Sequence, residues 1–169
     1  MAQGWDPSEM TVKAMLCEYA AMADSTLTTV GAGITRLITR PEPPHPIFGA
    51  LAVLTQVPWG ATNQQHRLTI ELVADAGGDE GVAKRVPINM REQTWLPEHE
   101  RGIATFRFNV GRPADMPPGA DTLFPLVLPL FGRQLPQLGS YFFHINLNGQ
   151  FADRVSFQVL APATSEAGG

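Results

Sequence analysis

The sequence predicts an all-β protein, built as a two-sheet sandwich of about seven to nine strands. Short runs in which apolar and polar residues alternate recur along the chain, and turn residues separate them. The 16 glycines and 15 prolines are many for 169 residues, and a hydrophobic content of 44% is too high for a disordered chain. The composition therefore fits one turn-rich globular domain, and we expect it over residues 11–160, between flexible tails at 1–10 and 161–169.

The clearest predicted element is a hairpin near the end of the chain. Residues 141–147 and 155–159 both follow an alternating pattern, and Asn148-Gly149 stands between them. Asn-Gly favours a two-residue hairpin turn because both of its residues tolerate a positive φ angle. The pattern therefore predicts two antiparallel strands that are neighbours in one sheet.

Four further strands are predicted from alternation. They span residues 12–20, 27–38, 68–72 and 104–110. We expect a turn at Asp24-Ser25 between the first two strands. Gly31 and Gly33 interrupt the second strand and indicate a bulge or a close backbone approach.

Residues 47–57 form a predicted strand that is apolar on both faces. One face carries Ile47, Leu51, Val53 and Val57, and the other carries Phe48, Ala50, Ala52 and Leu54. A strand of this kind is covered on both sides, whereas the outer face of a two-sheet sandwich usually meets water. The cover is either a second subunit or partner, or a loop of the same chain, and the pattern favours neither.

The charge pattern excludes some classes of partner. The formal net charge is -4, and no cluster of lysines and arginines offers a phosphate-binding surface, so we do not expect a nucleic-acid partner. The longest apolar run, 123–131, is short and contains two prolines, so no membrane-spanning helix is expected. No leader segment is visible, and the predicted location is the cytoplasm.

The residues do not suggest a metal site, a cofactor or a catalytic centre. The four histidines are widely scattered, and Cys17 is the single cysteine, placed inside a predicted strand as a small buried side chain. The acidic loop 75–81 fits a solvated connection better than a calcium site. We therefore expect a protein that is not an enzyme; a ligand or catalytic site would require Cys17, His66 and His144 to converge.

Two tryptophans are candidates for contact with a partner, because exposed tryptophan is a common interface anchor. Trp59 follows Pro58 at a strand end, where a plug beneath a loop is the favoured interpretation. Trp95 lies in the charged loop 88–101, where both interpretations are balanced. The candidate partner-binding residues are Phe48, Leu54, Trp59 and Trp95.

Several short stretches, taken together, resemble a known family. They are Ala14–Ala20, Ala23-Asp24, Gly31-Ala32-Gly33, Val57-Pro58-Trp59 with Asn63 and His66, Gly111-Arg112-Pro113 and Gly139-Ser140-Tyr141. In this order they resemble a family of small, mostly high-GC bacterial proteins of unknown function, over residues 12–160. The resemblance implies an immunoglobulin-like β-sandwich and brings no catalytic residues. Independently, Gly139-x-Tyr141 resembles a late strand of many immunoglobulin-like domains, in which a tyrosine bonds to nearby backbone.

These observations support three functional hypotheses. The leading one is a non-enzymatic interaction module that binds another protein or a second copy of itself. The second is a structural accessory or decoration subunit of a phage or another protein shell. The third and weakest is a sandwich that binds a small ligand or acts as an enzyme.

Overall fold

The structure, a computed structural model, describes residues 9–75, 84–86 and 102–163. Within these ranges the chain forms thirteen β-strands, one short 3-10 helix at Trp59–Ala61 and no α-helix, so the prediction of an all-β fold is confirmed. The strands are β1 (Thr11–Cys17), β2 (Tyr19–Ala23), β3 (Thr26–Val30), β4 (Arg36–Ile38), β5 (His45–Ile47), β6 (Ala50–Val57), β7 (Gln65–Ala74), β8 (Lys84–Val86), β9 (Ile103–Asn109), β10 (Thr122–Pro129), β11 (Arg133–Leu135), β12 (Gly139–Leu147) and β13 (Gln150–Leu160). None of the described helical residues makes a segment long and apolar enough to cross a membrane.

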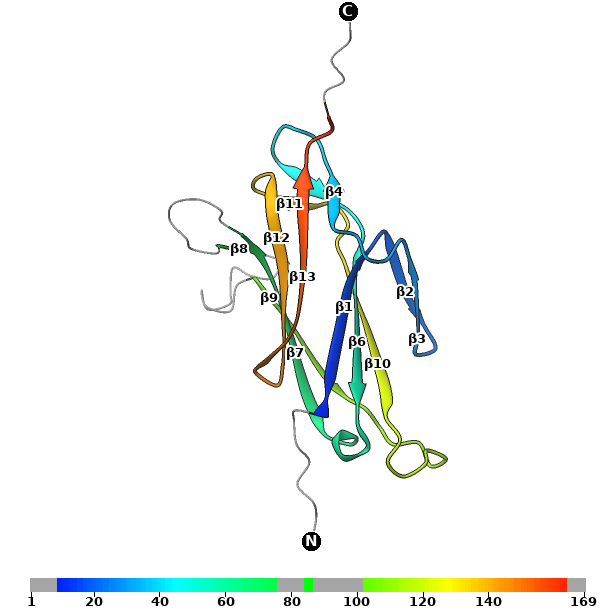
Figure 1. Ribbon diagram of the computed structural model, residues 1–169. Helices are drawn as coiled ribbons and strands as arrows, with labels where there is room; N and C mark the ends of the chain where they lie inside the picture. Colours follow the sequence, from blue (N-terminus) through cyan, green and yellow to red (C-terminus); the bar gives the residue numbers. More distant parts are fainter. Residues whose placement is uncertain (1–8, 76–83, 87–101, 164–169) are drawn as a thin grey trace, which may run out of the picture.

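Two larger sheets face each other across the core (Figure 1). One has three strands in the order β1-β6-β10. The other has six, in the order β4-β13-β12-β7-β8, with β9 also paired to β7. The ribbons β2–β3 and β5–β11 contain the remaining four strands, so the predicted seven to nine strands correspond to the nine in the two larger sheets.

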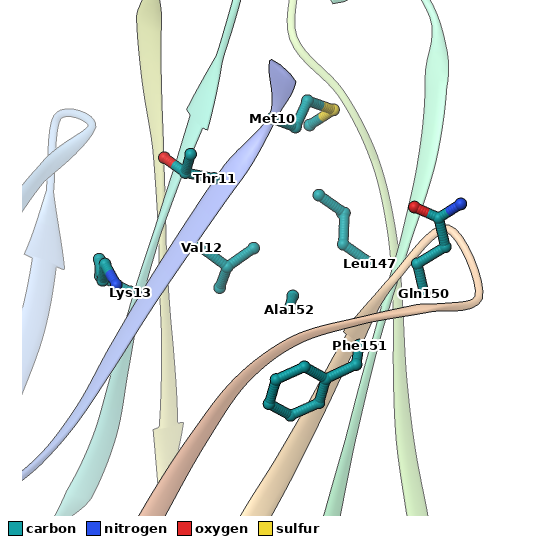
Figure 2. Close-up of a pocket in the computed structure, with 8 residues that line it drawn as sticks. All are labelled: Met10, Thr11, Val12, Lys13, Leu147, Gln150, Phe151 and Ala152. Atoms are coloured by element: carbon teal, nitrogen blue, oxygen red, sulfur yellow. The ribbon is translucent and has the colours of Figure 1, made fainter. Parts of the chain in front are cut away.

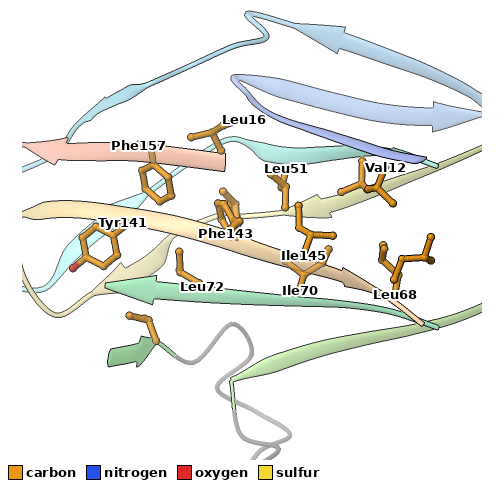
Figure 3. Close-up of a cluster of buried hydrophobic side chains, with 14 of the residues drawn as sticks. Val12, Leu16, Leu51, Leu68, Ile70, Leu72, Tyr141, Phe143, Ile145 and Phe157 are labelled. Carbon is orange, nitrogen blue, oxygen red and sulfur yellow. The ribbon is translucent and has the colours of Figure 1, made fainter. Parts of the chain in front are cut away.

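The core lies between these two sheets and follows the alternation of the sequence (Figure 3). Leu51 and Val53 of β6 are fully buried, and so are Ile70 of β7 and Phe143 and Ile145 of β12. Each of these side chains contributes about 1.5–3 kcal/mol by leaving water. Their neighbours in sequence point to the other face of each sheet, which is how a period of two positions a half-buried strand.

The predicted C-terminal hairpin is confirmed. β12 and β13 pair antiparallel, and the turn between them holds Asn148 at φ 52° and Gly149 at φ 85°. The predicted strands at 68–72 and 104–110 are also confirmed: the first lies within β7, and the second corresponds to β9.

The two strands predicted at 12–20 and 27–38 are each divided in the structure. The turn at Asp24-Ser25 is present, with φ angles of 48° and 63°. The chain leaves the three-stranded sheet after Cys17, and β2 and β3 form a separate ribbon. The predicted interruption at Gly31 and Gly33 is present as well, with φ angles of 60° and 87° between β3 and β4.

The strand predicted at 47–57 is confirmed over residues 50–57 as β6, but the prediction that it extends back to 47 is wrong, because the chain changes sheets at Phe48-Gly49. Gly49 has a φ of 117°, and a Cβ atom there would lie 2.5 Å from the backbone oxygen of Cys17. Only glycine fits this close approach. The residues before it therefore pair with β11, and the residues after it pair with β1 and β10.

The second apolar face of this segment is covered in part by the chain itself. Ala50 and Ala52 are buried on the outer face of β6, and Cys17 is buried beside them on β1. The β2–β3 ribbon packs against β6 and β10 (Figure 1). Of the two kinds of cover considered from the sequence, the same-chain cover is therefore present over this part of the face.

Candidate functional site

Two exposed phenylalanines flank a backbone hydrogen bond where the β6–β10 pair gives way to the β5–β11 ribbon. The exposed fractions of Phe48 and Phe131 are 62% and 72%. Their backbones are held together because the N–H of Leu130 donates to the carbonyl of Gly49 at 2.9 Å. Phe131 projects here because it occupies a four-residue turn, closed by a 2.9 Å hydrogen bond from the N–H of Arg133 to the carbonyl of Leu130.

The start of the β2–β3 ribbon, which follows Cys17 in the chain, carries two more exposed apolar residues. Tyr19 and Val30 are paired across the ribbon and are 51% and 52% exposed. Cys17, two residues before Tyr19, makes the close approach to Gly49 described above. We call Tyr19, Val30, Phe48 and Phe131 the apolar corner surface.

Arg133 borders the apolar corner surface and has an unusual environment for an arginine. On β11 it pairs with Ile47, and its Nε atom is buried without a hydrogen-bond partner among the described residues. Burial also lowers the pKa of Arg133 from its ordinary value.

The other predicted partner-binding residues lie elsewhere. Leu54 is half-buried on the outer face of β6, between Lys13 and Pro125 in the strand pairing. Trp59 is half-buried in the 3-10 helix that follows β6. Trp95 and the whole loop 88–101 lie outside the described residues.

The ring of Trp59 is covered by Arg112. The guanidinium carbon of Arg112 lies 3.9 Å from the ring centroid of Trp59. The same guanidinium donates to the carbonyl of Trp59 at 2.8 Å and to the Oγ1 of Thr62 at 2.7 Å and 2.9 Å. These contacts support the interpretation of Trp59 as a plug at the end of the sandwich, where its arginine neighbour holds two loops together.

His66 also has a structural environment. Its Nε2 atom donates to the carbonyl of Ala61 at 2.8 Å, so its Nδ1 accepts from the side-chain amide of Asn148 at 3.2 Å. The ring packs at a tilt against Phe108, with 5.4 Å between the centroids. Both nitrogens are thus engaged inside the fold.

The three residues whose convergence a ligand or catalytic site would require do not converge. Cys17 lies on the outer face of the three-stranded sheet, beside Ala50 in the pairing. His144 lies on the outer face of the six-stranded sheet, between Glu71 and Arg154. His66 is buried near Ala61 at the loop end. Over the described ranges, no group of three or more His, Cys, Asp or Glu side chains is arranged to hold a metal ion.

Two buried groups have shifted pKa values with clear causes. Burial raises the pKa of the Cys17 thiol, and a backbone hydrogen bond from Ala52 lowers it by a smaller amount. Burial likewise raises the pKa of Tyr141, whose hydroxyl donates to the carbonyl of Gln137 at 2.6 Å. The predicted bond from Tyr141 to nearby backbone is thus present.

The fold and these contacts define an all-β sandwich domain that exposes the apolar corner surface. The chain belongs to a family described as a family of unknown function (DUF6941), whose model matches residues 13–160. The resemblance to a family of unknown function is thereby confirmed. None of the curated proteins compared with the chain matches it.

Among solved structures, the chain is similar to part of the alkylpurine DNA glycosylase AlkC of Pseudomonas fluorescens, bound to DNA containing an abasic site analog. The sequence identity is 11% and the TM-score is 0.39. The match covers 89% of this chain but only 30% of the glycosylase chain. A likeness this distant says nothing about what the chain does.

Proposed function

We propose that this chain is a non-enzymatic protein-interaction module that binds its partner through the apolar corner surface. The observation that carries the proposal is the pair Phe48 and Phe131, which are both largely exposed and are joined through adjacent backbone. Exposed aromatic side chains are typical anchors of protein interfaces. The proposal includes a cytoplasmic location.

The backbone around these phenylalanines is well defined, which favours binding. The turn that carries Phe131 is closed by its own hydrogen bond, and Phe48 is followed by Gly49, which is packed against Cys17. A surface whose backbone is already ordered loses little conformational entropy when a partner docks. We therefore infer that the corner is presented as a preformed anchor.

The environment of Arg133 indicates the chemistry of the partner. The surface beside it is apolar, and its Nε atom is buried inside the chain. A partner with an apolar patch complements this surface. Such a partner is either another protein or a second copy of this chain.

Native mass spectrometry of protein purified gently from its own host tests the proposal. We expect the wild-type chain at a mass above its own 18.3 kDa. A double variant, Phe48→Ser with Phe131→Ser, should run as the single chain, because two truncated anchors weaken binding by about 100-fold or more. The matched control is Leu123→Ser, which removes a side chain that is 56% exposed on β10.

The melting temperature of each variant separates loss of binding from loss of fold. The double variant should melt close to the wild type, because both side chains are mostly in water already. A wild-type protein that is monomeric in its host extract contradicts the proposal. So does a double variant that keeps the complex while remaining folded.

A further inference from the structure

Two arginines that are far apart in the sequence are paired directly on β7 and β9, which lie side by side (Figure 1). Arg67 of β7 is the register partner of Arg107 of β9, and both side chains are exposed. Their sequence neighbours Leu68 and Phe108 are buried in the core. Side chains alternate between the two faces of a strand, so both arginines project from the outer face of the six-stranded sheet.

The backbone geometry brings the two arginine side chains close together. The N–H of Arg67 donates to Oδ1 of Asn148 at 2.9 Å, and the carbonyl of Arg67 accepts the N–H of Asn148 at 2.8 Å. Asn148 directly follows β12, which lies on the opposite side of β7 from β9, so the backbone groups of Arg67 point away from β9. Arg67 and Arg107 therefore form a non-hydrogen-bonded pair of the antiparallel ladder, in which the Cα atoms are only about 4.5 Å apart.

No carboxylate of the described chain neutralises this arginine pair. Neither guanidinium makes a hydrogen bond or a salt bridge within the described ranges. The carboxylate on the outer face of β7 is Glu71, which lies about 13 Å from Arg67 along the strand and is bound to Arg85 at 3.1 Å. Like charges placed directly opposite each other destabilise a sheet. The pair therefore presents two adjacent positive charges that an anion from another molecule would neutralise.

We propose that Arg67 and Arg107 together bind a phosphorylated side chain of a partner protein. A phosphate monoester carries about −1.5 to −2 charges at neutral pH and has three acceptor oxygens. One such group neutralises both arginines and accepts hydrogen bonds from both guanidinium forks, whereas a carboxylate brings a single charge. This site shares no residue with the apolar corner surface and goes beyond the function proposed above, so either can fail without the other.

The open face around the pair favours a phosphate carried by a protein over a free small compound. A site for a small molecule is usually concave and encloses most of its ligand. A pocket of about 350 Å³ lies between β1 and the β12–β13 hairpin, and neither arginine is among the residues that line it (Figure 2). The cross-strand pairs on either side of the arginines are polar and uncharged: Thr69 with Thr105, and Gln65 with Asn109. These side chains can contact a peptide on both sides of its phosphate.

The probe is an end-blocked peptide, Ala-Thr-phosphoserine-Thr-Ala, titrated into the full chain in a phosphate-free buffer at neutral pH. The readout is the NMR signal of the side-chain Nε–Hε group of each arginine in isotope-labelled protein. We expect saturable shifts at Arg67 and Arg107, and none at Arg36, an exposed arginine on the edge strand β4 of the same sheet. The unphosphorylated peptide should bind at least about tenfold more weakly, because it lacks the charge-assisted hydrogen bonds of the phosphate.

Charge-matched variants identify the residues that bind. Arg67→Gln and Arg107→Gln should each weaken binding of the phosphopeptide by about fivefold or more, whereas Arg36→Gln removes the same charge and should change it by less than about twofold. In a phosphate-free buffer of low ionic strength, neither variant of the pair should lower the melting temperature, because each removes a like-charge contact. Loss of binding without loss of stability separates a binding role from a structural one. The double variant of Phe48 and Phe131 should bind the peptide like the wild type, which separates this site from the corner.

The outcomes that overturn the proposal are equally specific. If about 1 mM phosphopeptide gives no saturable shift at either arginine, the pair is only a solvated part of the surface. If inorganic phosphate binds as tightly as the phosphopeptide, the occupant is a small anion and not a partner protein. If the peptide with glutamate in place of phosphoserine binds equally well, a carboxylate suffices and the phosphate proposal fails. If a single-stranded oligonucleotide binds more tightly than the phosphopeptide, the pair contacts a nucleic-acid backbone instead.

Discussion

Replacement of Tyr141 by phenylalanine tests the hydrogen bond that fixes the start of β12. The Tyr141 side chain is 1% exposed, and its hydroxyl donates to the carbonyl of Gln137 at 2.6 Å. Tyr141→Phe deletes this one donor. It keeps the ring, including the stacked contact with Phe157 at 5.8 Å between centroids.

The expected loss follows from what each partner does afterwards. A hydrogen bond within a protein contributes about 0.5–1.5 kcal/mol net, and more when its loss leaves a buried group unpaired. Gln137 is exposed, so water can reach its carbonyl and limit the loss. We expect the free energy of unfolding to fall by about 1 kcal/mol, and the melting temperature by about 2–4 °C.

The pH dependence gives a second, independent readout. The pKa of Tyr141 is raised in the folded state, so the folded protein holds this proton more tightly than the unfolded chain. This stability is therefore fully present below about pH 10 and is lost as the pH rises through the folded pKa. The stability difference between wild type and Tyr141→Phe should shrink over that alkaline range.

Urea unfolding curves measured from about pH 8 upward test both expectations. The matched control is Tyr19→Phe, because Tyr19 is the other tyrosine of the chain and is 51% exposed. Its effect should stay within about 0.5 kcal/mol at every pH. The reasoning is refuted if Tyr141→Phe costs no more than the control, or if its effect does not change with pH.

Three further predictions test the packing around the candidate surfaces. Gly49→Ala should lower the free energy of unfolding by more than about 2 kcal/mol, because the added Cβ atom would meet the backbone oxygen of Cys17. Gly119→Ala is the control and should cost less, because no atom lies within 4 Å of the Cβ position there. Urea unfolding curves compare the two variants. The Cys17 thiol is fully buried and its pKa is raised. A disulfide reagent should therefore label the folded protein at least about 1,000-fold more slowly than the chain unfolded in urea. Labelling of the folded protein within the mixing time would contradict this burial. Arg112→Met removes the contacts with Trp59 and should lower the stability measured by thermal unfolding by about 1–2 kcal/mol. The control is Arg107→Met, at an exposed position. An equal effect of both variants would show that the contacts with Trp59 contribute little.

Local signals predicted the hairpin of β12 and β13 well. Asn148-Gly149 supports positive φ angles at low cost, and the flanking alternation identifies the buried face of each strand. Both signals act over a few residues, so the sequence contains them in readable form. The same holds for the turn at Asp24-Ser25.

The segment 47–57 shows why other predictions failed. Alternation describes a strand but not its sheet, and Gly49 separates two strands that belong to different sheets. The reason for that glycine is the backbone of Cys17, which is distant in sequence. A close approach between distant segments leaves no periodic pattern.

The candidate site was predicted only in part. Phe48 was selected from an apolar face, whereas Phe131 and Tyr19 were not selected. The Gly132 that follows Phe131, at φ 62°, is a turn signal that could have indicated an exposed position for Phe131. Nothing local indicates that the turn carrying Phe131 lies beside Gly49, because that pairing depends on the register of β6 and β10.

The sequence by itself determined the all-β class, the main turns and the faces of the strands that are buried, because each depends on residues within a few positions of one another. Tertiary structure alone decided which apolar side chains stay exposed. It packed the β2–β3 ribbon against β6, where Ala50 and Ala52 are buried, and it left Phe48 and Phe131 exposed. Exposure depends on which distant segments pack together, and that outcome is fixed by the whole set of contacts.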